Sequence, residues 1–307
     1  MFLRFLFLII FFMLASFSLS WGSEGEQKIV YLISGPRALS TVFLRMIESR
    51  GDFIVYNEPT IPVYDRVYYS DITEGWFRDD ANTTFEEVKR KIFELNKNSD
   101  VFVKDMSFSS HEYILNDQDF MKNPSIHYLF LVRNPHHTSI SFYKKVRDIF
   151  PGMSDLIGLK KLYEEYEAIR KMNPNGVKII FSEQLYNTPR LTMSALCNHL
   201  SIPFSERAFA WKKYDQKFQG HNEWNEQKTG SHIHHWHGRA IQSEQMEKPS
   251  SYETDNMGNP SFKEIEDDAH RVEMMSVYRE NLIYYKKFIN ANKDHLIPVN
   301  GSVKEAI

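Results

Sequence analysis

The chain has 307 residues, of which 42% are hydrophobic and 25% charged, the composition of a globular protein that can bury a substantial core. Its formal net charge of −3 excludes a broad electrostatic attraction to nucleic acid, so any site for an anion has to be local. The single cysteine, Cys197, excludes an intrachain disulfide framework and a metal site built from cysteines.

Residues 1–22 have the pattern of a targeting segment. Arg4 precedes an uncharged, mostly apolar run over residues 5–20, and the acidic residues Glu24 and Glu26 follow it. The run fits a signal peptide well and a membrane span only marginally, because a bilayer requires roughly 20 apolar residues. We therefore expect a signal peptide or signal anchor that directs the chain to the secretory pathway or anchors it to a membrane, with a cytoplasmic location as the alternative.

Short apolar strands then alternate with longer segments of helical spacing. The expected strands are residues 28–34, 53–58, 101–106, 126–132 and 177–183. The expected helices are residues 40–50, 84–98, 137–150, 158–173 and 261–289. The alternation predicts an α/β fold with a central parallel sheet flanked by helices. We expect one domain over residues 28–290 and a C-terminal tail over residues 291–307.

The first strand runs into a turn that has the layout of a phosphate-binding loop. Gly35, Pro36 and Arg37 form the turn, and Ser40 and Thr41 open the next helix. Free backbone N–H groups at a helix start, two hydroxyls and a guanidinium together make an anion site. The Gly-Lys-Ser/Thr signature of an ATP or GTP site is missing, and Gly-Pro turns are common. Taken alone, the loop leaves phosphate binding and an ordinary turn as equal alternatives.

A second strand, turn and helix has the same layout. Arg133 follows the strand, Asn134 and Pro135 suit a first helical turn, and Ser141 lies about two turns into the helix. Ligands of an open parallel sheet bind at the carboxyl ends of its strands, where Arg133 is placed. With two such elements each delivering an arginine and hydroxyls to one edge, a plain surface salt bridge is the less favoured interpretation of Arg133.

Two further charged residues are placed at strand ends. Glu58 follows the second strand and Lys104 belongs to the end of the third, so both are expected to face the same crevice. The structural alternative for Glu58 is a solvated loop acid or an ion-pair partner of Arg37.

The two loops together resemble the sulfotransferases that use 3′-phosphoadenosine 5′-phosphosulfate (PAPS). The stretch "GPRALST" resembles the family's 5′-phosphosulfate loop, and "RNPHHTSISFY" resembles its 3′-phosphate signature, with Tyr143 as the nearby aromatic residue. The resemblance covers roughly residues 28–204. It implies a P-loop-like three-layer sandwich and transfer of a sulfuryl group from PAPS to a hydroxyl or amine acceptor. The cofactor-binding residues that it implies are Arg37, Ala38, Leu39, Ser40, Thr41, Arg133 and Ser141.

The resemblance also implies catalytic roles. Glu58 corresponds to a general base, and Lys104 and Arg37 to groups that stabilise charge as the bond to sulfur breaks. Met106 stands where the cytosolic small-molecule branch carries a catalytic histidine, which argues against a base of that kind and leaves His111 as a fallback. The residues of this chain that would serve in the family's late, cofactor-covering loop are Lys228, Trp236 and Arg239.

Two other classes of protein stay open, a P-loop kinase with a degenerate loop and a non-catalytic nucleotide-binding module. A kinase has to hold the β- and γ-phosphates with Mg²⁺, and it needs the P-loop lysine and usually an acid on the metal. PAPS carries a phosphosulfate and a separate 3′-phosphate, so two cationic sites without a metal suit it better.

The histidine-rich stretch "HIHHWHGRA" raises the possibility of zinc. The clustered residues are His232, His234, His235 and His237. No local carboxylate or thiolate completes a site with evident geometry, so we expect no metal. The acceptor, whether a small molecule, a carbohydrate or a protein, cannot be identified from the sequence. We expect no nucleic-acid partner, and membrane contact only through the N-terminal segment.

Overall fold

The computed structural model describes residues 27–68, 83–146, 153–213, 223–224, 237–254 and 259–298. The targeting segment expected over residues 1–22 lies outside them, as do Lys228, Trp236 and the first three of the clustered histidines. No helix of the described ranges combines the length and the apolar character that crossing a membrane requires.

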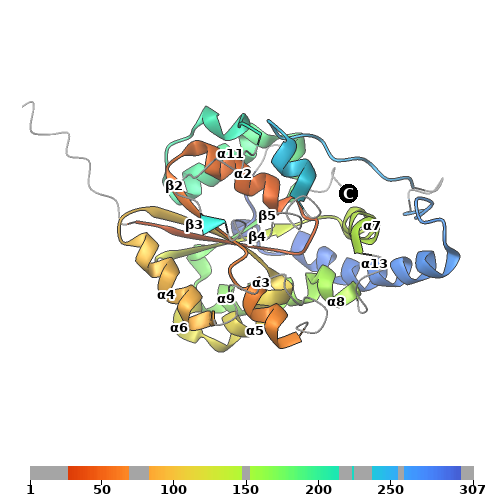
Figure 1. Cartoon of the computed structure of the whole chain (residues 1–307), viewed down its shortest axis with the longest axis horizontal. Helices are drawn as coiled ribbons and strands as arrows, with labels where there is room; N and C mark the ends of the chain where they lie inside the picture. The colour runs from red at the N-terminus through yellow and green to blue at the C-terminus, as the bar shows by residue number, and fades with distance from the viewer. Residues whose placement is uncertain are drawn as a thin grey trace, which may run out of the picture.

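A parallel β-sheet forms the middle layer (Figure 1). Its strands are β1 (Ile29–Ser34), β2 (Phe53–Asn57), β3 (Asp100–Met106), β4 (Ile126–Val132), β5 (Val177–Phe181) and the two-residue β6 (Glu223–Trp224). Their order is β5-β4-β1-β3-β2-β6, and each neighbouring pair is parallel. The strands expected from the sequence are present, and the predicted α/β class is confirmed.

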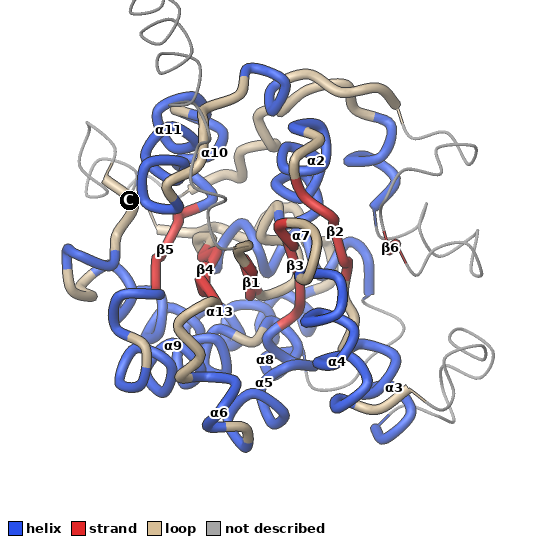
Figure 2. The backbone as a smooth tube through the Cα atoms, turned by 90° about the vertical axis from the view of Figure 1, so that its left-hand side faces the viewer, coloured by secondary structure: helices blue, strands red, loops and turns tan. Residues whose placement is uncertain are grey.

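Helices cover both faces of the sheet (Figures 1 and 2). Because successive strand residues point to opposite faces, Val30 and Leu32 of β1 pack in one hydrophobic cluster and Tyr31 and Ile33 in another. The first face is covered by α2 (Ser40–Arg50), α10 (Ser182–Asn187) and α11 (Pro189–Leu200). The second face is covered by α4 (Phe85–Asn96), α5 (Ser107–Asn116), α6 (Gln118–Met121), α9 (Leu159–Met172) and α13 (Asp268–Ile289). This is the central parallel sheet flanked by helices that the sequence predicts, arranged in three layers.

The carboxyl edge of the sheet brings together the loops of interest. β1 lies between β3 and β4, so that Ser34 at its end pairs with Met106 on one side and Leu131 on the other. On one side of β1 the sheet continues through β3 to β2, and on the other side it continues through β4 to β5. Ligands of open α/β sheets bind at such a point, where successive strands are added on opposite sides of the first. The helices at this edge are α3 (Ile61–Tyr68), α7 (Pro135–Val146) and α8 (Met153–Ile157).

Some elements differ from the sequence-based expectation. The last helix, α13, begins at Asp268 instead of residue 261, because the Asp267 carboxylate accepts the backbone N–H of His270 and caps the helix there. Helix α5 was not expected. Its buried residues are mostly serines, so it has no stripe of apolar residues to reveal it.

The segment after α13 packs on the sheet. Ile297 is buried, and its backbone N–H donates to the carbonyl of Ile179 in β5 at 3.0 Å. Residues 291–298, the described part of the segment expected as a tail, therefore lie against the β5 edge.

Candidate active site

The loop between β1 and α2 is held in a tight conformation. Arg37 and Leu39 both have left-handed backbone angles, with φ of 61° and 68°. A Cβ atom at Gly35 would lie 2.4 Å from the carbonyl oxygen of Ile157 in α8, so only glycine fits there. The turn delivers Ser40 to the first position of α2, as the sequence predicts.

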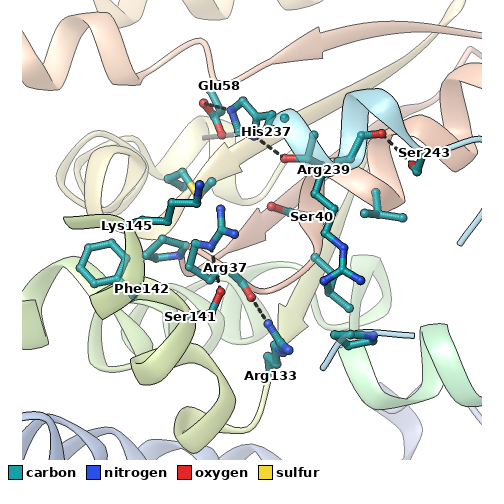
Figure 3. Close-up of a pocket in the computed structure, with 18 of the residues that line it drawn as sticks. Arg37, Ser40, Glu58, Arg133, Ser141, Phe142, Lys145, His237, Arg239 and Ser243 are labelled. Carbon is teal, nitrogen blue, oxygen red and sulfur yellow. Dashed lines mark hydrogen bonds and ion pairs between the residues drawn. The ribbon is translucent and has the colours of Figure 1, made fainter. Parts of the chain in front are cut away.

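The β4–α7 element meets this loop directly. Asn134 accepts the backbone N–H of His136 and starts α7 behind Arg133. Arg133 donates from Nη1 to the carbonyl oxygen of Arg37 at 2.7 Å, and Arg37 donates from Nε to Ser141 Oγ at 3.1 Å. Figure 3 shows these three side chains gathered on one side of the cavity. The two arginines that sequence reasoning placed at one edge are thus neighbours.

Arg133 is buried and Arg37 is half-buried. Burial lowers the pKa of Arg37, and the nearby charge of Arg133 lowers it further. Burial also lowers the pKa of Arg133, while Glu183 opposes this shift. Arg133 Nε is buried and has no hydrogen-bond partner in the described part of the chain. A buried guanidinium with an unused donor and a half-buried one beside it form an environment that an anion would stabilise.

Glu58 lies across the cavity at the end of β2. It has a left-handed backbone with φ of 49°, and its N–H donates to the carbonyl of Lys104 at 2.6 Å. Its carboxylate contacts the fully buried Lys104 ammonium through Oε1. Burial raises the pKa of Glu58, but Lys104 and His237 more than offset this, so the pKa is lowered overall. Lys104 is not among the cavity-lining residues and acts on the site through Glu58.

His237 lies between Glu58 and the start of α2. Its Nδ1 is 2.9 Å from Thr41 Oγ1, and its Nε2 is 3.9 Å from Glu58 Oε2 (Figure 3). Burial lowers the pKa of His237 to about 4; Glu58 opposes the shift, whereas Lys104 and Arg37 add to it. The ring is therefore neutral at pH 7. Sequence reasoning weighed this histidine only as a metal ligand and did not predict its contacts.

These residues enclose a cavity of about 310 Å³ at the carboxyl edge of the sheet. Its wall includes Arg37, Leu39, Ser40, Thr41, Glu58, Met106, Arg133, Ser141, His237 and Arg239. Asp65 of α3 also lines it, and burial together with the charge of Glu58 raises the pKa of this carboxyl to about 7. Sequence reasoning missed Asp65, and Lys145 of α7 as well, because neither follows a strand directly.

Other residues singled out in the sequence lie elsewhere. Ala38 is buried in the loop, where its carbonyl accepts the Ser182 hydroxyl at 2.6 Å. The Tyr143 hydroxyl bonds to His270, away from the cavity wall. His111 bonds to Glu164 at 2.9 Å and does not line the cavity.

Arg239 lines the cavity and forms an exposed ion pair with Glu247 at 3.4 Å. Within the described ranges, no group of three or more histidine, cysteine, aspartate or glutamate side chains could hold a metal ion.

Comparisons with known proteins identify distant similarities. No family model matches the chain. The chain is 26% identical over 192 residues to branched-chain-amino-acid aminotransferase-like protein 2 of Arabidopsis thaliana, a match that covers 61% of this chain and 32% of that protein. It is 25% identical over 198 residues to the corresponding protein 1 of the same plant, with the same coverage. The chain thus spans about a third of the length of these curated relatives.

Three solved structures are similar to the chain at low TM-scores. The sulfotransferase domain from the curacin biosynthetic pathway is 15% identical with a TM-score of 0.41, covering 85% of this chain and 98% of that one. The sulfotransferase domain of the Synechococcus PCC 7002 olefin synthase is 15% identical with a TM-score of 0.39, covering 88% and 98%. A sulfotransferase from Alicyclobacillus acidocaldarius is 17% identical with a TM-score of 0.38, covering 56% and 81%. A likeness at this level does not extend to individual residues or to an activity.

Proposed function

We propose that the protein is a sulfotransferase that moves a sulfuryl group from PAPS to a hydroxyl or amine acceptor. One observation carries the proposal: Arg133 is bonded to the backbone of Arg37, and Arg37 is bonded to Ser141, at one cavity. Two guanidiniums at one cavity suit a nucleotide that carries a phosphosulfate and a 3′-phosphate. The resemblance of both loops to the signatures of PAPS-dependent sulfotransferases points the same way.

Each cationic element takes one end of the nucleotide in this proposal. Arg37, Ser40, Thr41 and the start of α2 bind the phosphosulfate and stabilise the charge that develops on its bridging oxygen. Arg133 binds the 3′-phosphate, for which its unpartnered Nε is a donor in place. Because each anionic end of the nucleotide has a protein cation in this proposal, its binding needs no metal ion.

Glu58 is the proposed general base. It faces the cavity opposite the arginines, and Lys104 keeps its carboxylate ionised at neutral pH. An ionised carboxylate can accept the proton of the acceptor as the new bond to sulfur forms. Lys104 would thus contribute by holding Glu58 in its working charge state.

Transfer of radiolabelled sulfuryl from PAPS to a panel of hydroxyl and amine compounds tests the proposal. We expect Glu58→Gln to lower the rate by about 100-fold or more, because it removes the base. Its affinity for 3′-phosphoadenosine 5′-phosphate (PAP) should change less than about twofold, since Glu58 lies away from the arginines. Glu94→Gln, at an exposed position of α4, is the matched control and should retain full activity.

The two alternatives have different signatures in this experiment. A nucleotide-binding module would bind PAP and transfer no label to any acceptor. A degenerate kinase would prefer ATP with Mg²⁺ over PAP. Either result would overturn the proposal.

A further inference from the structure

His237 lies between two parts of the site with different proposed functions, the phosphosulfate loop and the general base. One ring nitrogen faces Thr41 at the start of α2, and the other faces the Glu58 carboxylate. The ring lies on the cavity wall at the start of the short helical segment 237–242. A residue in this position touches both the proposed phosphosulfate loop and the proposed base.

The surroundings select one tautomer of the His237 ring. A neutral imidazole has one N–H donor and one acceptor nitrogen. The Glu58 carboxylate is an acceptor only, so an N–H is favoured on the nitrogen that faces it, Nε2. Nδ1 is then the acceptor, and the Thr41 hydroxyl donates to it.

The spacing of His237 and Glu58 would allow one further polar atom to form hydrogen bonds to both. A separation of 3.9 Å between Nε2 and Oε2 is too long for a direct hydrogen bond. An oxygen or nitrogen placed about 2.8 Å from both would see them at roughly a right angle, which is acceptable geometry for a hydroxyl or an amine. Lys104 occupies Oε1 of Glu58, so Oε2 is the oxygen left to face a ligand.

We propose that the nucleophilic atom of the acceptor binds between His237 Nε2 and Glu58 Oε2, which makes His237 a further catalytic residue. The inference rests on the proposed function. The His237 N–H donates to a lone pair of the acceptor atom and orients it, while the acceptor's own proton points to Glu58. In the transfer, that proton moves to Glu58 Oε2 and the acceptor atom forms the bond to sulfur. The bond between sulfur and the bridging oxygen breaks, and its electron pair stays with the 5′-phosphate of PAP.

Two substitutions distinguish a donor from a base at position 237. The glutamine side chain of His237→Gln keeps an N–H donor but has no basic nitrogen, whereas His237→Ala removes both. We expect His237→Ala to lower kcat/KM by about 100-fold and His237→Gln to stay within about tenfold of the wild type. PAP affinity should change much less than kcat/KM in both, because His237 reaches the phosphosulfate loop only through Thr41. His111→Gln, whose histidine bonds to Glu164 off the cavity, is the matched control. Equal losses in the two variants, or no loss in either, would overturn the proposal.

A measurement without turnover separates this inference from the proposed function. Long-range proton–nitrogen NMR of the full chain labelled in its histidine rings reports the tautomer, and His237→Gln identifies the signal. The expected result at pH 7 is a neutral ring with its proton on Nε2. A proton on Nδ1, or an imidazolium at pH 7, would contradict the inference even if sulfuryl transfer were found. If the expected tautomer is found but no sulfuryl group is transferred, that result would count against the proposed function alone.

Discussion

The ion pair of Glu58 and Lys104 determines the charge state on the acceptor side of the cavity. The Lys104 side chain is fully buried and the Glu58 side chain is 16% exposed, so each charge depends mainly on the other for compensation. Removing one member of a buried pair leaves the other charge uncompensated.

Lys104→Met should therefore lower the free energy of unfolding by about 3–5 kcal/mol at pH 7. In this variant only His237 opposes the effect of burial, which is the largest influence on Glu58, so we expect its pKa in the folded protein to rise above the unfolded value. Its protonated form then becomes the favoured one, so the loss of stability should shrink as the pH falls toward 5. Denaturant unfolding at several pH values measures this.

The double variant Lys104→Met/Glu58→Gln and the surface variant Lys122→Met are the controls. The double variant should recover much of the lost stability, because no unpaired charge stays buried. Lys122 is 60% exposed, so its replacement should have little effect. A Lys104→Met cost that does not change with pH would show that Glu58 does not respond to this lysine.

Asp105 provides a second prediction at the residue scale. Burial raises its pKa to about 7, although hydrogen bonds from Tyr31, Thr60 and the Met106 N–H oppose the shift. A raised folded-state pKa means that Asp105 contributes stability at low pH, which is lost as the pH rises from about 4 to about 7. Asp105→Asn should remove this part of the pH dependence, and Asp119→Asn on the surface should not. Parallel pH profiles for wild type and Asp105→Asn would contradict the assignment.

The sequence identifies the site residues that follow strands, and it misses those that packing brings in. Arg37, Glu58 and Arg133 could be predicted because the carboxyl ends of parallel strands converge at one edge. His237 could not, since it is placed by a segment far along the chain that has no strand pattern. Its position in a histidine-rich stretch was the only available signal, and that signal suggested a metal.

At the scale of elements, the β1–α2 loop depends on its contact with α8. A Cβ atom at Gly35 would lie 2.4 Å from the backbone oxygen of Ile157, so a side chain there has to displace backbone. We expect Gly35→Ala to lower the free energy of unfolding by about 1–3 kcal/mol and to weaken PAP binding. Gly238→Ala, which adds a methyl group on the wall of the same cavity, is the steric control, because a Cβ there meets nothing within 4 Å. Equal stability and PAP affinity in the two variants would show that the loop adapts freely.

For elements with a strong apolar pattern, the bounds expected from the sequence agree with those in the structure. The bounds of β4 and α2 match the expected residues 126–132 and 40–50, and α2 ends where Gly51 adopts a left-handed conformation with φ of 79°. The two-residue strand β6 was not predicted, because its only described pairing is with β2 and two residues carry no pattern.

At the scale of the whole molecule, the two arginine-bearing elements on neighbouring strands make binding of one nucleotide the central claim. A ligand that binds only the folded chain stabilises it by about 2.7 kcal/mol at a concentration one hundred times its Kd. The strength of that effect should depend on Arg133, because charge-assisted hydrogen bonds to phosphate are among the stronger contacts in proteins.

Isothermal titration calorimetry of the full chain with PAP tests this claim most directly. We predict one binding site per chain with EDTA present, at least about tenfold weaker binding in Arg133→Ala, and no change in Arg90→Ala on the exposed surface of α4. No binding of PAP, or binding of ATP that is tighter than that of PAP and requires Mg²⁺, would contradict the account.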